Sequence, residues 1–136
     1  MFRIGRYPFG FSHDVIESDG RPYLERWILH CGGTLRVHRF LSSDEDRAVH
    51  DHPWWFVTLP FTAYAEYVTE GDHEVRRVVR PFRLHFRPAR FQHRVELLRA
   101  PTWTVILTGP KRREWGFWPQ DRFVHNRDWE SQGPGA

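Results

Sequence analysis

The chain has 136 residues, enough for one domain with its own core but hardly for two. Its formal net charge is +3, and arginine supplies almost all of the positive charge, since Lys111 is the only lysine. The arginines are scattered among acidic residues, which argues against a nucleic-acid-binding surface. A single cysteine excludes an intramolecular disulfide, and no apolar run reaches the about 18 residues of a membrane span. Because the N-terminus also lacks a signal-peptide pattern, we expect a cytoplasmic protein.

Turn-forming residues recur at short intervals along the chain, and the segments between them are rich in β-branched and aromatic residues. Aromatic residues make up 16% of the sequence, which favours strands and flat pockets over a bundle of helices. No amphipathic helix and no internal repeat is found. We therefore predict strands, in chain order, over residues 22–30, 34–41, 49–59, 62–69, 74–80, 82–87, 92–98, 102–108 and 115–118.

Many short antiparallel strands in one small domain predict a sandwich or barrel, which closes or covers the edges of its sheets. We place a single all-β domain over residues 1–129, with residues 1–20 as an N-terminal arm and residues 130–136 as a flexible tail. The strand over residues 49–59 is apolar on both faces, because Trp55 and Leu59 lie opposite its inward side chains. Such a strand needs an outer cover, either the arm or a second copy of the chain, and we expect a homodimer.

Alternation of side chains assigns faces to two of the later strands. Phe91 and His93 share the apolar side of their strand, which predicts that His93 points inward. In the strand over residues 82–87 the apolar side carries Phe86 and the basic residues lie on the other side. We therefore expect Phe86 inside the domain and the basic side chains outside it.

His50 and His52 are separated by one residue, so on a strand both imidazoles project from the same face. Together with an inward His93 they give three imidazoles on the inner surface of one domain. Neutral imidazole binds Zn, Fe, Ni, Cu or Mn, and three protein ligands leave coordination positions open. From spacing alone a second interpretation is equally good, in which His50 and His52 lie in an acidic surface loop and His93 is a hydrogen-bonded core residue.

The segments that carry these histidines resemble the two metal-binding motifs of the cupin superfamily. The first cupin motif supplies His-x-His, and the second supplies a histidine after Pro-x-Gly-x-x, where Pro88 and His93 occupy the matching positions. The resemblance covers roughly residues 34–108. It implies a double-stranded β-helix, the RmlC-like jelly roll, in which His50, His52 and His93 hold one divalent metal ion inside the barrel.

The sequence departs from the cupin pattern at both motifs. The first motif usually has a glutamate four or five residues after its second histidine, where this chain has Phe56 and Val57. The glycines of the second motif are replaced by Phe82 and Arg90. The remaining ligand set is similar to that of three-histidine cupins such as thiol dioxygenases. That similarity concerns the site and does not establish a thiol substrate.

Glu66 is the candidate replacement for the missing carboxylate. If residues 60–61 form a two-residue hairpin loop, Glu66 faces outward with Trp55, whereas a three-residue loop turns it to the metal side with Phe56. Three roles stay open: a metal ligand, a hydrogen-bonding partner of the ligands, or a surface residue in a salt bridge. Tyr64 lies on the same face as Glu66 and shares its orientation.

A pocket beside the metal is expected to have aromatic walls that exclude bulk water. His38 is a further candidate for a contact with substrate or ligand, but the pattern over residues 34–41 does not decide which face it occupies. The basic run over residues 111–113 follows Gly109-Pro110 and is interpreted as a solvated turn rather than a clamp for an anion. The candidate pocket and substrate residues are Trp54, Phe56, Tyr64, His38, Phe86 and Phe91.

These residues favour a mononuclear non-haem metal enzyme, with Fe(II) as the leading ion and Zn, Ni, Mn and Cu as alternatives. The expected reaction is oxygenation of a small organic substrate by an oxygenase or dioxygenase, with anions among the candidate substrates. Two alternatives stay open. One is a redox-neutral isomerase, epimerase or lyase that acts on a sugar or hydroxy acid, and the other is a cupin that binds a small molecule without turnover.

Overall fold

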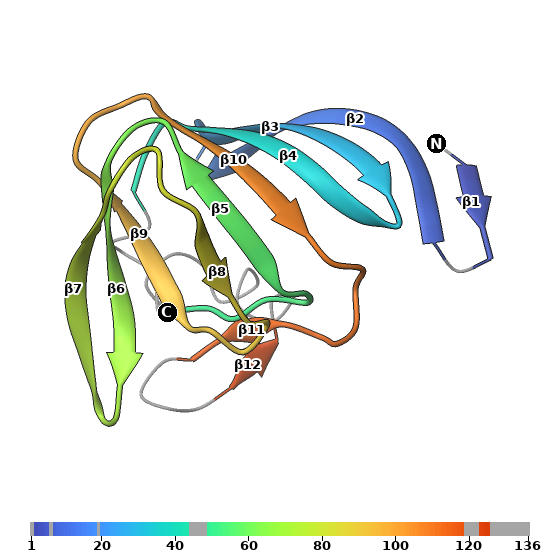
Figure 1. Ribbon diagram of the computed structural model, residues 1–136. Coiled ribbons are helices and arrows are strands. Elements are labelled where there is room, and N and C mark those ends of the chain that lie inside the picture. The colour runs from blue at the N-terminus through green and yellow to red at the C-terminus, as the bar shows by residue number, and fades with distance from the viewer. Residues whose placement is uncertain (1, 6, 19, 44–48, 119–122, 126–136) are drawn as a thin grey trace.

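The computed structural model describes residues 2–5, 7–18, 20–43, 49–118 and 123–125 (Figure 1). Within these residues every regular element is a β-strand, which confirms the all-β prediction. None of the described residues belongs to a helix long and apolar enough to cross a membrane. The tail predicted over residues 130–136 lies outside the described residues.

Two main sheets form the walls of the domain, and both are antiparallel. The larger has the strand order β1-β2-β3-β4-β10-β5-β8, the smaller β7-β6-β9, and a short pair β11-β12 lies near one end of the two sheets (Figure 1). The large sheet contains β1 (Phe2–Ile4), β2 (Tyr7–Ser18), β3 (Arg21–Cys31), β4 (Gly33–Phe40), β5 (Phe56–Pro60), β8 (His85–Arg87) and β10 (Thr102–Thr108). The others are β6 (Tyr64–Glu70), β7 (His73–Val79), β9 (His93–Leu97), β11 (Gly116–Phe117) and β12 (Val124–His125). This is the predicted jelly-roll architecture.

The N-terminal arm consists of strands that widen the large sheet. β2 pairs with β3 along most of its length, with a register shift after Ile16. In the strand order, β3, β4 and β10 separate β2 from β5. The arm therefore does not reach the outer side of β5, and Trp55 beside that strand remains 39% exposed.

The predicted strand over residues 49–59 is shorter in the structure, because regular pairing begins only at Phe56. Before it, His50 makes isolated bridges to His93 and Phe117, and the chain bends at residues 53–54. Pro53 has no N–H to donate to a ladder, which accounts for the break in the strand. The two histidines thus lie on a segment that leaves the sheet and passes across the end of the barrel.

The faces predicted for residues 82–87 are reversed. Phe82 has a φ of 61° in a turn, so β8 starts later than expected. Pairing with β5 then sets Arg87 opposite the buried Phe56, and Phe86 is left outside with 62% of its surface exposed. The outer face of the large sheet also carries apolar side chains. An apolar side in residues 82–87 therefore did not mark the side that faces the interior.

Among the described residues, apolar side chains form two small packed clusters, and the space between the sheets is partly open. Tyr64, Val79 and Val95 pack together in the smaller sheet, and Phe117 packs against Val124. Between the walls lies a cavity of about 440 Å³. This volume is within the range of small-molecule sites in proteins.

Candidate metal centre

The segment that carries His50 is fixed by backbone hydrogen bonds on both sides. The His50 N–H donates to the His93 carbonyl at 2.9 Å, and the His93 N–H donates to the His50 carbonyl at 3.1 Å. On the other side, the Asp51 N–H donates to the Gly116 carbonyl at 3.0 Å. A two-residue spacing therefore still brings the side chains of His50 and His52 together, although the segment is not a regular strand.

The structure brings His50, His52 and His93 together at the wall of the cavity. One candidate ligand atom from each side chain lies within 4.8 Å of those of the other two. The ring centroids are 5.2 Å apart for His50 and His52, and 5.0 Å for each of the two pairs with His93. Among the described residues this cluster has the composition of a three-histidine metal site, with no carboxylate in it.

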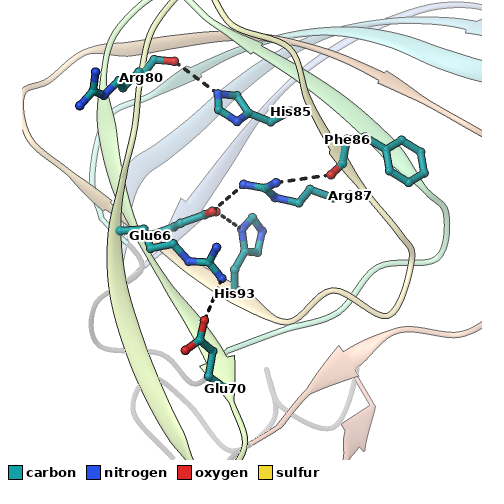
Figure 2. A network of polar contacts seen from close by, with 8 residues as sticks. Glu66, Glu70, Arg80, His85, Phe86, Arg87 and His93 are labelled. Carbon is teal, nitrogen blue, oxygen red and sulfur yellow. Dashed lines mark hydrogen bonds and ion pairs between the residues drawn. The ribbon is translucent and has the colours of Figure 1, made fainter.

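Glu66 lies behind His93 and is 1% exposed, so it is not a surface residue. Figure 2 shows its carboxylate between His93 and Arg87. The oxygen Oε2 is 2.9 Å from Nδ1 of His93, and Oε1 accepts a hydrogen bond from Arg87 at 2.8 Å. A carboxylate that accepts from Nδ1 fixes the orientation of the imidazole and leaves the other ring nitrogen for a metal ion.

The length of the turn after β5 does not decide how Glu66 points, which corrects the hairpin argument from the sequence. β5 and β6 belong to different sheets, and β6 pairs with β9 instead. In that pairing Glu66 lies opposite Val95, and Val68 lies opposite His93. The long-range partner strand therefore sets the face of Glu66, and Tyr64 shares this buried face.

The protonation states of Glu66 and His52 suit metal binding. Burial acts to raise the pKa of Glu66, but the hydrogen bonds from His93 and Arg87, with the positive charge of Arg87, outweigh it and the pKa is lowered. Burial, followed by the neighbouring His93 and His50, lowers the pKa of His52 well below its usual value. Glu66 is thus ionised and His52 neutral at neutral pH, and neutral imidazole is the form that binds metal ions.

An unpartnered nitrogen at His52 also fits a bound ion. Its Nδ1 is buried and has no hydrogen-bond partner among the described residues. Buried polar atoms in proteins are nearly always paired, because an unpaired one loses its hydration without compensation. Three imidazoles, one of them held by a carboxylate and one with a free buried nitrogen, form a suitable donor set for a divalent first-row metal.

Asp51 anchors the histidine segment, a role that the sequence analysis missed. Its carboxylate is 1% exposed and accepts hydrogen bonds from the Gly116 N–H at 2.8 Å and from Nε1 of Trp118 at 3.0 Å. Arg113 completes the site with an ion pair to Asp51 at 3.0 Å and a hydrogen bond to the His52 carbonyl. Arg113, predicted to lie in a solvated turn, therefore supports the site. The role of Asp51 could have been suspected from the alternation of side chains, because it turns Asp51 away from both His50 and His52.

The cavity beside the histidines contains four of the six predicted pocket residues: Trp54, Phe56, Tyr64 and His38. Phe86 is not among them, because its exposed ring packs 6.2 Å from that of Trp55. In Figure 2 this ring points away from His93. Phe91 does not line the cavity either. Its ring packs 5.2 Å from that of His93, with Arg87 stacked on it at 4.6 Å. Other side chains that were not predicted from the sequence also line the cavity, among them Arg36, Thr58, Thr104, Trp115 and Phe117.

His38 and Tyr64 are both neutral in the cavity wall. Burial, with the nearby Arg36 and Arg26, lowers the pKa of His38 to about 3. Burial also raises the pKa of Tyr64, and the Glu66 carboxylate adds to this shift. The cavity therefore presents an uncharged imidazole and a protonated phenol at neutral pH.

Replacement of Glu66 by glutamine is expected to weaken metal binding by about 10- to 100-fold, the usual effect of losing a partner that orients a ligand histidine. The dissociation constant for Co²⁺, measured by competition with a chelator, tests this. Glu70→Gln is the matched control, because Glu70 lies on the same strand but is exposed and forms its ion pair with Arg77. Equal affinities of the two variants would contradict the role given to Glu66.

Protonation of His38 is expected to destabilise the fold as the pH falls. Its pKa of about 3 in the folded state lies below the unfolded value near 6.5, so the unfolded chain binds the proton first. The stabilisation is complete above the unfolded pKa and is lost progressively toward pH 3. Between pH 8 and pH 5, the free energy of unfolding should fall by about 2 kcal/mol more in the wild type than in His38→Gln. Urea unfolding at several pH values measures the difference, and parallel curves would contradict it.

Comparison with known proteins supports the fold. Neither a protein-family profile nor a curated protein sequence matches the chain. Among solved structures, HppE with Fe(II) matches with a TM-score of 0.60 and 7% sequence identity, over 77% of this chain and 62% of HppE. A mutant of Bacillus subtilis oxalate decarboxylase OxdC matches with a TM-score of 0.57 and 14% identity, over 85% of this chain and 30% of OxdC.

AerE from Microcystis aeruginosa gives a similar result, with a TM-score of 0.56 and 14% identity over 78% of this chain and 48% of AerE. The chain thus spans about three fifths of HppE and smaller shares of the other two. At such identities the likeness establishes the fold alone. HppE, oxalate decarboxylase and AerE are cupin-fold proteins. The protein described here therefore has the cupin fold, in a divergent form with three histidines gathered at its cavity.

Proposed function

We propose that the protein is a metal-dependent enzyme, a mononuclear non-haem iron oxygenase or dioxygenase that acts on a small organic molecule. The observation that carries this proposal is the convergence of His50, His52 and His93 at one wall of a cavity of about 440 Å³. Three protein ligands leave coordination positions free for other molecules, and the cavity gives those molecules a place to bind.

Iron is supported by the donor set and by the structural neighbours. Three neutral imidazoles suit several first-row metals, and geometry and availability choose among them. HppE was solved with Fe(II) and with Co(II), and oxalate decarboxylase contains Mn(II) centres. When bound, an iron ion would supply open coordination positions and one-electron redox chemistry.

The side chains around the histidines would hold the ligands and keep water out. Glu66 accepts from Nδ1 of His93 and keeps that ring in one orientation. Trp54 stacks on His52 at 5.8 Å and Trp115 lies 6.2 Å from His50, so aromatic rings cover both imidazoles. Tyr64 keeps its proton and can donate a hydrogen bond to a bound molecule.

A redox-neutral lyase is the second candidate function. The observation that favours it is the structural match to oxalate decarboxylase, a protein with Mn(II) centres. In that case the ion would act as a Lewis acid, and turnover would not need oxygen. Binding of a small molecule without turnover is the third reading of the same cavity.

Metal content and oxygen consumption distinguish these functions. Protein purified without chelators should contain iron, and its Fe(II) form should consume oxygen in the presence of one member of a panel of hydroxy acids, catechols and thiols. His50→Ala and His93→Ala should each lose most of the bound metal and the oxygen uptake. The control is His73→Ala, because His73 is exposed at the start of β7 and lies outside the cluster.

Two results would overturn the iron proposal. Bound manganese or zinc with turnover that does not require oxygen would favour the lyase. A protein that binds no divalent metal, or that keeps its metal after His50→Ala and His93→Ala, would contradict both enzymes.

We also propose that the protein forms a homodimer through the outer face of the large sheet. One row of apolar side chains crosses six neighbouring strands, because each member pairs with the next across the sheet. Five of its members are more than 40% exposed, and no strand of the described chain covers them. A continuous row of this kind is self-complementary about a twofold axis. The row consists of Phe11, Leu29, Leu35, Leu107, Val57 and Phe86.

The dimer proposal predicts that one charge in the row separates the copies. Leu107→Glu should shift the molecular mass in solution, measured by analytical ultracentrifugation, from twice the chain mass to the chain mass. The matched control is Leu98→Glu, since Leu98 is 47% exposed against 45% for Leu107 but lies in a loop outside the row. A wild type that sediments as a monomer would contradict the proposal.

A further inference from the structure

Two polar side chains in the cavity wall are buried without partners. His38 on β4 is 7% exposed and Thr104 on β10 is 1% exposed, and the two residues lie opposite each other in the sheet. The two ring nitrogens of His38 have no hydrogen-bond partner among the described residues. The Thr104 hydroxyl has none there either. Both side chains line the cavity.

The neighbouring threonines show that this lack of partners is specific to one place. Thr102 and Thr108 lie on the same strand and the same face as Thr104, and both are buried. The Thr102 hydroxyl donates to the Arg99 carbonyl at 2.6 Å, and the Thr108 hydroxyl is 2.6 Å from that of Thr34. Since buried polar groups are normally paired, the unpaired set at His38 and Thr104 marks a position for a ligand's polar atoms.

A cation that forms no ion pair among the described residues lies next to this pair, with Asp14 as a nearby opposite charge. Arg36 lies two residues before His38 on the same face of β4 and also lines the cavity. Its Nε donates to the Thr34 hydroxyl at 2.8 Å, and none of the described ion pairs includes it. By contrast, the nearby Arg26 makes two hydrogen bonds to Asp14, at 2.8 and 2.6 Å. Burial and the charge of Arg26 lower the pKa of Arg36 to about 10, so it still carries a positive charge at neutral pH.

The Arg36 guanidinium is close to the histidine cluster. It lies over the Trp54 ring at 4.8 Å, and Trp54 stacks on His52 at 5.8 Å. These two contacts place the guanidinium no more than about 11 Å from the His52 ring. One small molecule can therefore reach from Arg36 to the histidines within the same cavity.

We propose that Arg36, His38 and Thr104 form a subsite for the carboxylate of a small organic acid. The Arg36 fork would bind the carboxylate, and the His38 imidazole and the Thr104 hydroxyl would each donate a hydrogen bond to this acid. The inference rests on the proposed function, because it names the class of molecule that the same cavity takes. It assigns the anionic end of that molecule to the side of the cavity formed by β4 and β10.

Binding of lactate, its neutral amide lactamide, and methylphosphonate to the full-length protein tests this subsite. Isothermal titration calorimetry is carried out on metal-free protein and on protein loaded with Co²⁺. Lactate should bind both forms, and lactamide should bind at least about tenfold more weakly. Arg36→Met should weaken lactate binding by about 10- to 100-fold and Thr104→Val by about tenfold, with the Co²⁺ content unchanged.

The matched control is Arg39→Met, because Arg39 lies on the opposite face of β4 and pairs with Glu25. This variant should bind lactate like the wild type. Equal binding of lactate and lactamide, or wild-type binding by Arg36→Met and Thr104→Val, would overturn the subsite. Tighter binding of methylphosphonate than of lactate would overturn the assignment to a carboxylate.

The metal-free arm keeps this test separate from the proposed function. If the protein binds no divalent metal, the enzyme proposals fail, but the loss of lactate affinity in Arg36→Met can still be measured. If the metal binds and lactate does not distinguish the variants, the subsite fails alone. Thr104→Val is nearly isosteric, so it provides a folded variant even if Arg36→Met is unstable.

Discussion

The buried carboxylate of Glu66 is the interaction on which the site depends. It joins the two walls of the barrel, since Glu66 and His93 belong to the smaller sheet and Arg87 belongs to the large one. A carboxylate loses much of its hydration when it is buried, and only good hydrogen bonds compensate for that loss. Here each oxygen has one partner, at 2.8 and 2.9 Å. Loss of either partner would leave a buried charge poorly compensated, so the link constrains both the fold and the orientation of His93.

Inside the barrel, this buried polar link lies beside an open cavity. The outer face of the large sheet instead exposes apolar side chains. His38 and Thr104 face inward and Leu35 and Leu107 face outward, although each pair lies on the same two strands. The inner face of the large sheet thus carries buried polar side chains beside its apolar ones, and its outer face carries exposed apolar side chains, which partly reverses the usual arrangement of a sandwich. The inner face suits ligand binding, and the outer face suits the contact of the proposed homodimer.

This reversal explains which features could be predicted from the sequence. Period-two alternation predicts that His50 and His52 share a side and that His93 shares one with Val95, and both relations are seen in the structure. Alternation does not tell which side is inside when the outer face is also apolar. Phe86 was therefore placed inside and Arg87 outside, and His38 could not be placed.

The face of Glu66 depends on a different kind of information. It follows from the pairing of β6 with β9, which are separated by more than twenty residues, and no local pattern reports this pairing. The roles of Asp51 and Arg113 likewise depend on β11 and on the turn before it, which lie far along the chain. The sequence thus predicted the strands from β3 to β11, with bounds too wide at β5 and β8, and the grouping of the three histidines, but not β1, β2 and β12. The residues that support the histidines required long-range contacts.

The position of the carboxylate distinguishes this site from the cupin pattern that the sequence resembles. Phe56 stands where that pattern has a glutamate, and its ring packs 4.5 Å from the ring of His52. The carboxylate is found instead behind His93, as a hydrogen-bond acceptor. In the proposed site the three neutral ligands would not offset the charge of a divalent ion, so the centre would have a net charge of about +2. It would also have one more open coordination position than a site with four protein ligands. In this proposal a more positive centre, with the Arg36 guanidinium in the same cavity, would favour a negatively charged substrate over a neutral one, because both positive groups would attract anions.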